Sequence, residues 1–125
     1  MSVCSLKGGV GKTSVTLGLA SAALHQGVNT LVIDLDPQGD STLGLLGEPG
    51  TSLDVAEVVS SPRTETVDRA IILVPWSEGA ASHLDLIPGS NRSTMMDSPS
   101  PSEREVKRLR EALDKRSHQY DLVLI

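Results

Sequence analysis

Aromatic residues and cysteine are scarce in this chain. Of its 125 residues only 2% are aromatic, phenylalanine is absent, and Cys4 is the single cysteine. One cysteine excludes an internal disulfide bond, so the composition fits a reducing compartment. Because bulky aromatic side chains are nearly missing, a hydrophobic core must be built from leucine, valine, isoleucine and alanine.

The chain also lacks an excess of positive charge and any long apolar run. Eleven Lys and Arg against sixteen Asp and Glu leave a formal net charge of -5. This balance argues against a nucleic-acid surface spread over the segment, because phosphate backbones attract positive fields. No apolar run approaches the roughly 20 residues of a membrane span, and the chain does not begin with a signal-peptide pattern. We expect a cytoplasmic protein without a membrane association.

The hydrophobic pattern of the first forty residues predicts a βαβ unit. A short apolar run at 2–6 predicts a buried strand. Thr13–Gln26 predicts a helix packed on a sheet, with Val15 on one of two apolar sides and Gly27 at its C-terminal end. Thr30–Ile33 is a continuous aliphatic and β-branched run, which is typical of a strand buried on both faces. A parallel sheet follows from this order of elements.

The remainder predicts shorter elements. We expect helical turns at 41–46 and 66–70, and a helix through Val59 that either Ser52 or Asp54 caps. We also expect a strand at Leu84–Ile87 and a strand in the closing stretch "YDLVLI". The run at 71–75 is ambiguous, and Ser102 with Glu105 forms a capping box that predicts a last helix. Because the sequence stops after a strand that looks central, we expect an unpaired sheet edge there.

A glycine-rich stretch, "LKGGVGKTS" at 6–14, stands between the first predicted strand and the first predicted helix. The amides of such a loop and the unpaired amides of a helix start together form an anion site. Gly8, Gly9 and Gly11 allow the main chain to wrap a phosphate without Cβ clashes. Leu6 departs from the strict phosphate-loop pattern, which has glycine at that position. Taken alone, the stretch also fits a turn that binds nothing.

Two residues at the predicted helix start have the chemistry of triphosphate binding. Lys12 is placed to reach the β- and γ-phosphates, and Thr13 to set its hydroxyl on Mg²⁺. A second acidic stretch, "DLDPQGDST", follows the second predicted strand and carries Asp34 and Asp36. Carboxylates at the C-terminal edge of a parallel sheet suit water-mediated Mg²⁺ binding and orientation of an attacking water. A plain polar turn is the alternative for this stretch.

Taken together, "KGGVGKTS" and "DLDPQGDST" resemble the deviant Walker A motif and its partner loop in ParA/Soj-type chromosome and plasmid partition ATPases. The closing "YDLVLI" resembles the next landmark strand of that family. The resemblance implies an α/β, P-loop NTPase-like three-layer fold with a mostly parallel sheet, truncated after the fourth strand. Residues 1–125 would then be the N-terminal part of a single nucleotide-binding domain.

The same resemblance implies an ATP-binding and ATP-hydrolysing dimerisation switch for DNA segregation, with ATP and Mg²⁺ as cofactors. It implies a homodimer on ATP binding, a ParB-like activator, and non-specific DNA binding through a C-terminal region absent here. The full-length protein would be cytoplasmic and nucleoid-associated, and the activity of this fragment alone stays open.

The resemblance also implies individual residue roles. The signature lysine, Lys7, would reach the partner's nucleotide across the dimer much as an arginine finger does, and Lys12 would neutralise the phosphates of its own site. Catalysis would depend on Lys7, Lys12 and Asp36. Metal binding would involve Thr13, Asp34 and Asp36, with Asp34 in the outer shell. The residues that would bind the nucleotide are Lys7, Gly8, Gly9, Val10, Gly11, Lys12, Thr13 and Ser14.

Three other functions stay open at this point. An iron-protein-type reductase shares the signature lysine but needs cysteine ligands for a cluster, and Cys4 stands alone on the first predicted strand. A MinD-like positioning ATPase needs a C-terminal amphipathic helix, which these residues do not contain. An inactive truncated fragment would bind no MgATP.

Overall fold

The structure is a computed structural model, and it describes residues 1–3, 11–48, 53–89, 107, 110–111, 113–114 and 116–125. The elements in chain order are α1 (Lys12–His25), β1 (Thr30–Ile33), α2 (Asp40–Leu46), α3 (Val55–Ser60), α4 (Thr64–Ala70), β2 (Ile72–Leu73), the 3₁₀ turn η1 (Pro75–Ser77), β3 (Leu84–Ile87) and β4 (Leu122–Leu124). Described residues between 107 and 117 are also helical.

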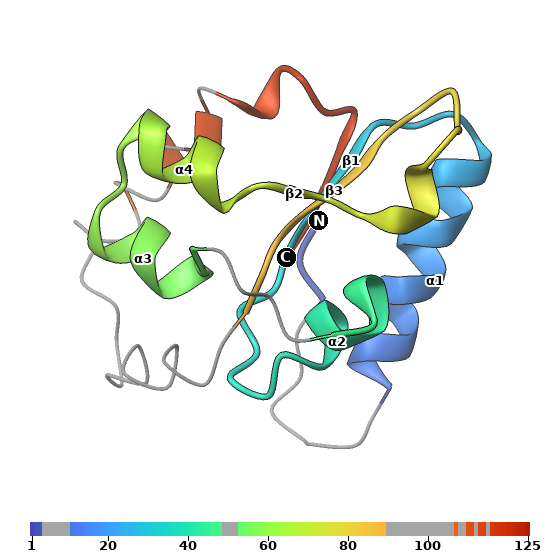
Figure 1. The fold of residues 1–125 in the computed structure, drawn as a ribbon, viewed down its shortest axis with the longest axis horizontal. Coiled ribbons are helices and arrows are strands. Elements are labelled where there is room, and N and C mark those ends of the chain that lie inside the picture. The colour runs from blue at the N-terminus through green and yellow to red at the C-terminus, as the bar shows by residue number, and fades with distance from the viewer. Residues whose placement is uncertain (4–10, 49–52, 90–106, 108–109, 112, 115) are drawn as a thin grey trace.

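The strands form one sheet in the order β2-β3-β1-β4. β1 pairs in parallel with both β3 and β4, and β2 pairs antiparallel with β3. Figure 1 shows the sheet between two groups of helices, with α1 and α2 on one side and α3 and α4 on the other. The predicted α/β fold with three layers and a mostly parallel sheet is therefore confirmed.

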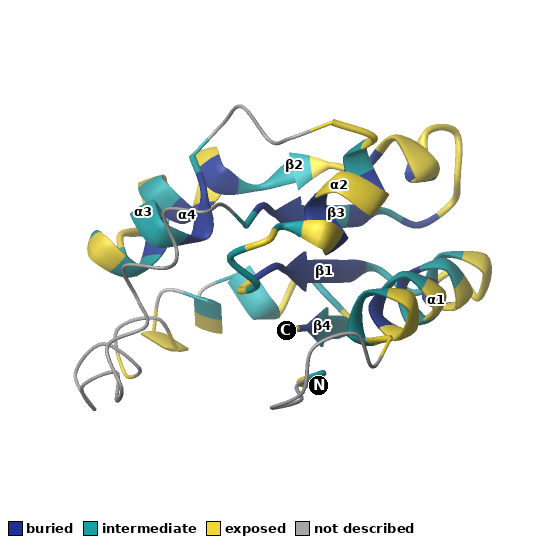
Figure 2. Cartoon of the chain, turned by 90° about the horizontal axis from the view of Figure 1, so that it is seen from below, coloured by how far each residue is buried: buried dark blue, intermediate teal, exposed yellow. Residues whose placement is uncertain are grey.

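Alternating side chains of β1 fill two separate aliphatic cores. Leu31 and Ile33 pack with residues of α3 and α4, whereas Val32 packs with residues of α1 and α2. All four residues of β1 are buried, as Figure 2 shows by the dark strand at the centre of the sheet. The prediction of a strand buried on both faces is confirmed. This central strand delivers its C-terminal loop to the edge of the sheet where α1 begins.

The predicted helix at 13–26 is confirmed within one residue at each end, and Gly27 follows it with a φ of 74°. The predicted place of Val15 on an apolar side of this helix was wrong, because its side chain is 51% exposed. The buried side of α1 consists of Thr16, Ala20 and Ala23. Leu17, Leu19 and Leu24 also pack against the core on this side of the sheet. Val15 lies outside the part of the helix surface that these residues cover.

The other predicted helices differ little from the observed ones. α2 matches its prediction within one residue at each end, and α3 ends one residue later than predicted. Of the two predicted caps of α3, Asp54 is the observed one, and it accepts a hydrogen bond from the Glu57 amide at 3.2 Å. α4 begins two residues earlier than predicted. The capping box of Ser102 and Glu105 lies outside the described residues.

The expectation of an unpaired edge after the last strand was wrong. The Val3 amide donates to the Ile125 carbonyl at 2.6 Å, and the Ile125 amide donates to the Met1 carbonyl at 2.9 Å. The start of the chain thus runs alongside the end of β4, which has β1 on its other side. The ambiguous run at 71–75 contains β2, a strand of two residues that pairs antiparallel with β3.

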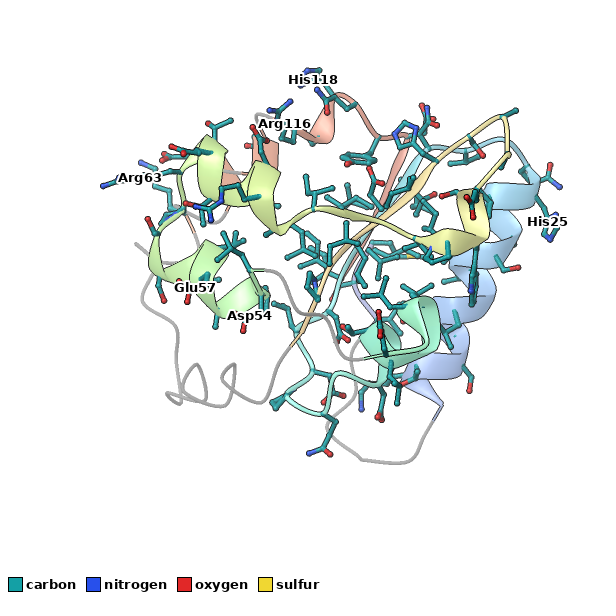
Figure 3. The ribbon with its side chains drawn as sticks, in the orientation of Figure 1. His25, Asp54, Glu57, Arg63, Arg116 and His118 are labelled. Atoms are coloured by element: carbon teal, nitrogen blue, oxygen red, sulfur yellow. The ribbon has the colours of Figure 1, made fainter. Side chains whose placement is uncertain are left out.

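Polar side-chain contacts tie the C-terminal segment to α4 and β3. Arg116 forms an ion pair with Asp68 of α4 (Figure 3). The Tyr120 hydroxyl donates to Asp85 of β3 at 2.6 Å, and His83 packs edge-on against the Tyr120 ring at 5.6 Å. These contacts bring the segment before β4 onto the α4 side of the sheet.

Candidate functional site

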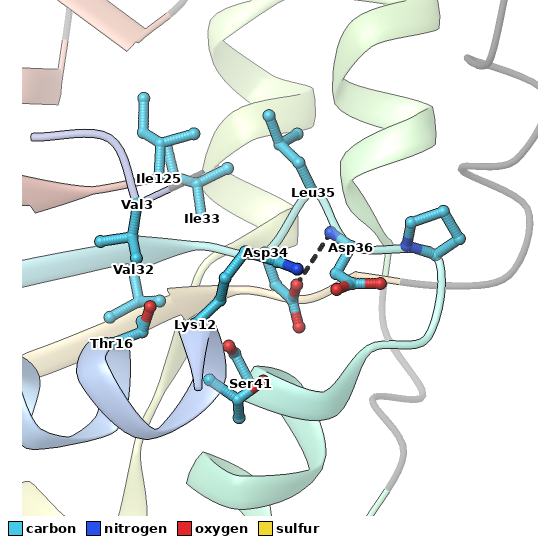
Figure 4. Close-up of a pocket in the computed structure, with 12 residues that line it drawn as sticks. Val3, Lys12, Thr16, Val32, Ile33, Asp34, Leu35, Asp36, Ser41 and Ile125 are labelled. Carbon is cyan, nitrogen blue, oxygen red and sulfur yellow. Dashed lines mark hydrogen bonds between the residues drawn. The ribbon is translucent and has the colours of Figure 1, made fainter. Parts of the chain in front are cut away.

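A pocket of about 280 Å³ lies where β1 and β4 end and α1 begins. Ligands of open α/β sheets bind at this position, outside the carboxyl ends of strands on either side of a change in strand order. Figure 4 shows the residues that line it. They are Val3, Lys12, Thr13, Thr16, Val32, Ile33, Asp34, Leu35, Asp36, Pro37, Ser41 and Ile125.

The N-terminus of α1 opens onto this pocket without a local cap. The N-cap residue is Gly11, with a φ of 84°, and no side chain caps the helix from that position. The first turn contains no acidic residue. The positive end of the helix dipole and its unpaired amides are therefore not neutralised by the first turn itself, which favours an anion in front of it.

The structure places some of the predicted phosphate-binding residues and leaves others undescribed. Lys12 and Thr13 both line the pocket, and Figure 4 shows the Lys12 side chain extending across it toward Asp34. Ser14 lies on α1 with its side chain exposed. The predicted residues Lys7, Gly8, Gly9 and Val10 lie outside the described residues.

Asp34 is a buried carboxylate that is already held by its own fold. Its side chain is 4% exposed. The Asp36 amide donates to Oδ1 at 3.0 Å, while the Thr42 amide and hydroxyl donate to Oδ2 at 2.8 and 2.7 Å. Asp34 therefore closes the loop after β1 and caps α2 from outside that helix, because the N-cap residue Gly39 offers no side chain.

Asp36 is less buried and stands at the pocket wall. Its Oδ1 accepts a hydrogen bond from the Gln38 amide at 2.9 Å, which forms an Asx turn and fixes the orientation of the carboxylate. Both carboxylates predicted from the sequence thus lie in one pocket with Lys12. Asp34 maintains the loop geometry, whereas Asp36 has more freedom to face a ligand.

The donor set of the pocket fits magnesium only when phosphate oxygens complete it. Among the described residues, no group of three or more His, Cys, Asp or Glu side chains is arranged to hold a metal ion. Mg²⁺ is commonly bound by one or two carboxylates together with substrate phosphates and waters. The three histidines do not gather either, and Figure 3 shows His25 and His118 on separate parts of the surface.

Sequence reasoning missed four residues that belong to the site or support it. Thr16 and Ser41 are buried and line the pocket. Thr42 bonds to Asp34, and the Gly89 amide donates to the Thr42 hydroxyl at 2.9 Å. Thr42 belongs to the "DST" of the acidic stretch, which by itself indicates no role for this residue. No sequence pattern indicated a role for Gly89, because its contact is with a residue 47 positions away in the chain.

The whole chain, residues 1–125, matches the profile of the AAA domain family. The sporulation initiation inhibitor protein Soj of Bacillus subtilis is 26% identical over 133 residues, covering 100% of this chain and 47% of Soj. A ParA family protein of Chlamydia trachomatis is 35% identical over 130 residues, covering 100% of this chain and 48% of that protein. The chain thus spans about half the length of the curated relatives it matches.

Solved structures resemble the fold over nearly the whole chain. A plasmid partition protein from Borrelia burgdorferi superposes with a TM-score of 0.78 and 27% identity, covering 99% of this chain and 53% of that one. Cobyrinic acid a,c-diamide synthase from Mycobacterium smegmatis, with bound ATP analogue and magnesium, superposes with a TM-score of 0.79 and 28% identity. The match covers 99% of this chain and 48% of the synthase. The predicted P-loop NTPase-like fold is confirmed by these likenesses.

No helix in the described part of the chain combines the length and apolar character needed to cross a bilayer. The uncapped start of α1, the acidic loop after β1 and the similarities over residues 1–125 agree with one another. The chain therefore belongs to the AAA domain family and resembles its ParA/Soj-type partition proteins, whose N-terminal half it spans.

Proposed function

We propose that these residues form the phosphate-binding half of an ATP-hydrolysing dimerisation switch for segregation of a chromosome or plasmid. The observation that carries the proposal is the meeting of Lys12, the uncapped start of α1 and Asp36 in one pocket. The likeness to a plasmid partition protein from Borrelia burgdorferi supports the choice of process. A structural neighbour with bound ADP and magnesium supports the choice of nucleotide and metal.

The roles of the pocket residues follow from their chemistry. Lys12 and the amides at the start of α1 bind the phosphates and neutralise their charge. Thr13 offers a hydroxyl oxygen to Mg²⁺, and Asp36 orients the attacking water. Asp34 acts from the outer shell, because both of its oxygens already accept hydrogen bonds. Magnesium, when bound, stabilises negative charge on the phosphate oxygens.

Lys7 has the remaining role in this proposal. One lysine on each subunit would reach the nucleotide of its partner and stabilise charge that develops in the transition state. Hydrolysis would then require two subunits, so ATP would bridge a homodimer. A ParB-like partner would stimulate the reaction in the cytoplasm. Residues 1–125 have a net charge of -5, which disfavours DNA binding. DNA would therefore bind non-specifically through a region outside these residues.

The experiment that tests this function uses the complete natural protein that contains these residues. Mass is measured by light scattering with and without MgATP for the wild type, Lys7→Ala and Lys12→Ala. We expect ATP-dependent dimers in the wild type but in neither lysine variant, with ATP binding retained in Lys7→Ala and lost in Lys12→Ala. Lys107→Ala is the matched control, because the Lys107 side chain is 76% exposed on the C-terminal helix. A Lys7→Ala protein that dimerises and hydrolyses ATP cooperatively would contradict the proposed role.

The likeness to a diamide synthase supports a second candidate, an ATP-dependent synthase built on the same fold. Such an enzyme would consume ATP only in the presence of a carboxylic acid acceptor and would form no ATP-dependent dimer on DNA. Measuring ATP turnover with DNA and a partner protein, and separately with a carboxylic acid acceptor, distinguishes the two candidates. Turnover stimulated by DNA and a partner protein supports partition, and turnover that needs an acceptor acid supports the synthase.

A further inference from the structure

The side chain of Thr42 joins three separate segments next to the pocket. It is 2% exposed and projects from the first turn of α2. Its hydroxyl donates to Asp34 Oδ2 at 2.7 Å and accepts a hydrogen bond from the Gly89 amide at 2.9 Å. One hydroxyl therefore links the end of β1, the start of α2 and the residues that follow β3.

Gly89, two residues after β3, lies against the main chain of the acidic loop. A Cβ on Gly89 would stand 2.9 Å from the carbonyl oxygen of Asp34 and 3.1 Å from that of Asp36. A Cβ on Gly39 would lie 3.6 Å from the Gly89 carbonyl oxygen. The loop that carries Asp36 thus rests on the backbone of Gly89, and only glycine at that position permits the approach.

Thr42 is connected to Asp36 through the side chain of Asp34. The carboxylate of Asp34 accepts from Thr42 on one oxygen and from the Asp36 amide on the other. A rotation of this carboxylate would therefore move the main chain of Asp36. A threonine hydroxyl within a helix can bond back to a carbonyl of the preceding turn, whereas the Thr42 hydroxyl bonds to two other segments.

We propose that Thr42 is a positioning residue for ATP hydrolysis, which acts by holding the Asp36 loop against Gly89. The inference rests on the proposed function for the identity of the reaction, and on the three hydrogen bonds for the mechanism. Packing alone does not require the hydroxyl, because valine has the same shape. The hydroxyl is needed to set the position of Asp36 relative to the phosphates bound at α1.

The test compares Thr42→Val with Thr42→Ser in the complete natural protein, measuring ATP affinity and turnover separately. A displacement of about 1 Å at a reacting group can cost about a hundredfold in rate. We expect Thr42→Val to lower kcat by about tenfold to a hundredfold, with the ATP dissociation constant changed by less than about threefold. Thr42→Ser retains the hydroxyl and restores kcat to within about threefold. Equal kcat in Thr42→Val and wild type would overturn the proposal.

A glycine substitution tests the same contact from the other side. Gly89→Ala keeps the Thr42 hydroxyl but pushes the Asp36 loop away, so it should reproduce the loss of kcat. Gly18→Ala is the matched control, because a Cβ on Gly18 meets nothing within 4 Å and its φ is not positive. Gly89→Ala with wild-type kcat would contradict the positioning role.

Hydrogen exchange separates this proposal from the proposed function. In Thr42→Val, the amides of Asp36, Thr42 and Gly89 should exchange faster by at least about tenfold, with exchange in β1 and β3 unchanged. Unchanged exchange at these amides would overturn the proposal even if the protein hydrolyses ATP. If the wild type hydrolyses no ATP, or if Asp36→Asn hydrolyses it normally, the proposed function fails, and exchange still decides whether Thr42 holds the loop.

Discussion

Replacing Asp34 by asparagine tests the geometry on which the acidic loop depends. An amide has one acceptor oxygen and one NH₂ donor, whereas the carboxylate accepts three hydrogen bonds, one on Oδ1 and two on Oδ2. The less costly orientation of the substituted amide keeps its oxygen toward Thr42 and turns its NH₂ group against the Asp36 amide. That orientation removes one hydrogen bond and opposes two donors.

The expected loss follows from these contacts. A hydrogen bond to a charged group contributes about 1.5–3 kcal/mol, and the two remaining bonds weaken because the acceptor becomes neutral. Burying a neutral amide instead of a charge offsets part of this loss. We therefore expect Asp34→Asn to lower the free energy of unfolding by about 1–3 kcal/mol.

The assay is equilibrium unfolding in urea, followed by the fluorescence of Trp76, the single tryptophan of the chain. Asp114→Asn is the control, because the Asp114 side chain is 65% exposed and lies 3.9 Å from Arg110 in a surface pair of small energetic value. A change below about 0.5 kcal/mol for Asp34→Asn would refute the reasoning, since it would match an ordinary surface substitution.

Three further substitutions test the rest of the fold. Gly18→Ala should raise the free energy of unfolding by about 0.5–1 kcal/mol, because Gly18 lies within α1 with open space for a Cβ. Gly27→Ala, at a φ of 74°, should lower it by about 1 kcal/mol, and urea unfolding that reverses this order would contradict the backbone argument. Burial and the hydrogen bond to Asp85 raise the pKa of the Tyr120 hydroxyl well above its usual value. The pKa is higher in the folded state, so its contribution to stability is complete below about pH 10 and declines as the pH rises beyond that. Tyr120→Phe should flatten this alkaline decline and lower the free energy of unfolding at neutral pH by about 1 kcal/mol. An unchanged dependence of stability on alkaline pH would contradict the role of the Tyr120–Asp85 hydrogen bond.

The sequence allowed prediction of elements whose signals are local. The run Thr30–Ile33 is wholly aliphatic or β-branched and was predicted as a doubly buried strand, which the structure confirms. The start of α1 was predicted because glycine, lysine and threonine have distinct roles at a phosphate-binding helix start. Both features depend on residues close together in the chain.

Features that depend on distant contacts were not predicted. Apolar residues surround α1 on several sides, so periodicity alone did not show that Val15 would be exposed. The strand Ile72–Leu73 has two residues and forms only because β3 lies beside it. The contact between Thr42 and Gly89 joins residues 47 positions apart, and neither residue type signals it in advance.

The central claim is that the start of α1 and Lys12 bind the phosphates of ATP. Calorimetric titration of MgATP into the complete natural protein, compared between wild type and Lys12→Ala, tests it most directly. Because a charge-assisted contact to phosphate would be removed, we expect the affinity of Lys12→Ala to fall by at least about tenfold. Equal affinity in the two proteins, or no binding heat in the wild type, would contradict the claim.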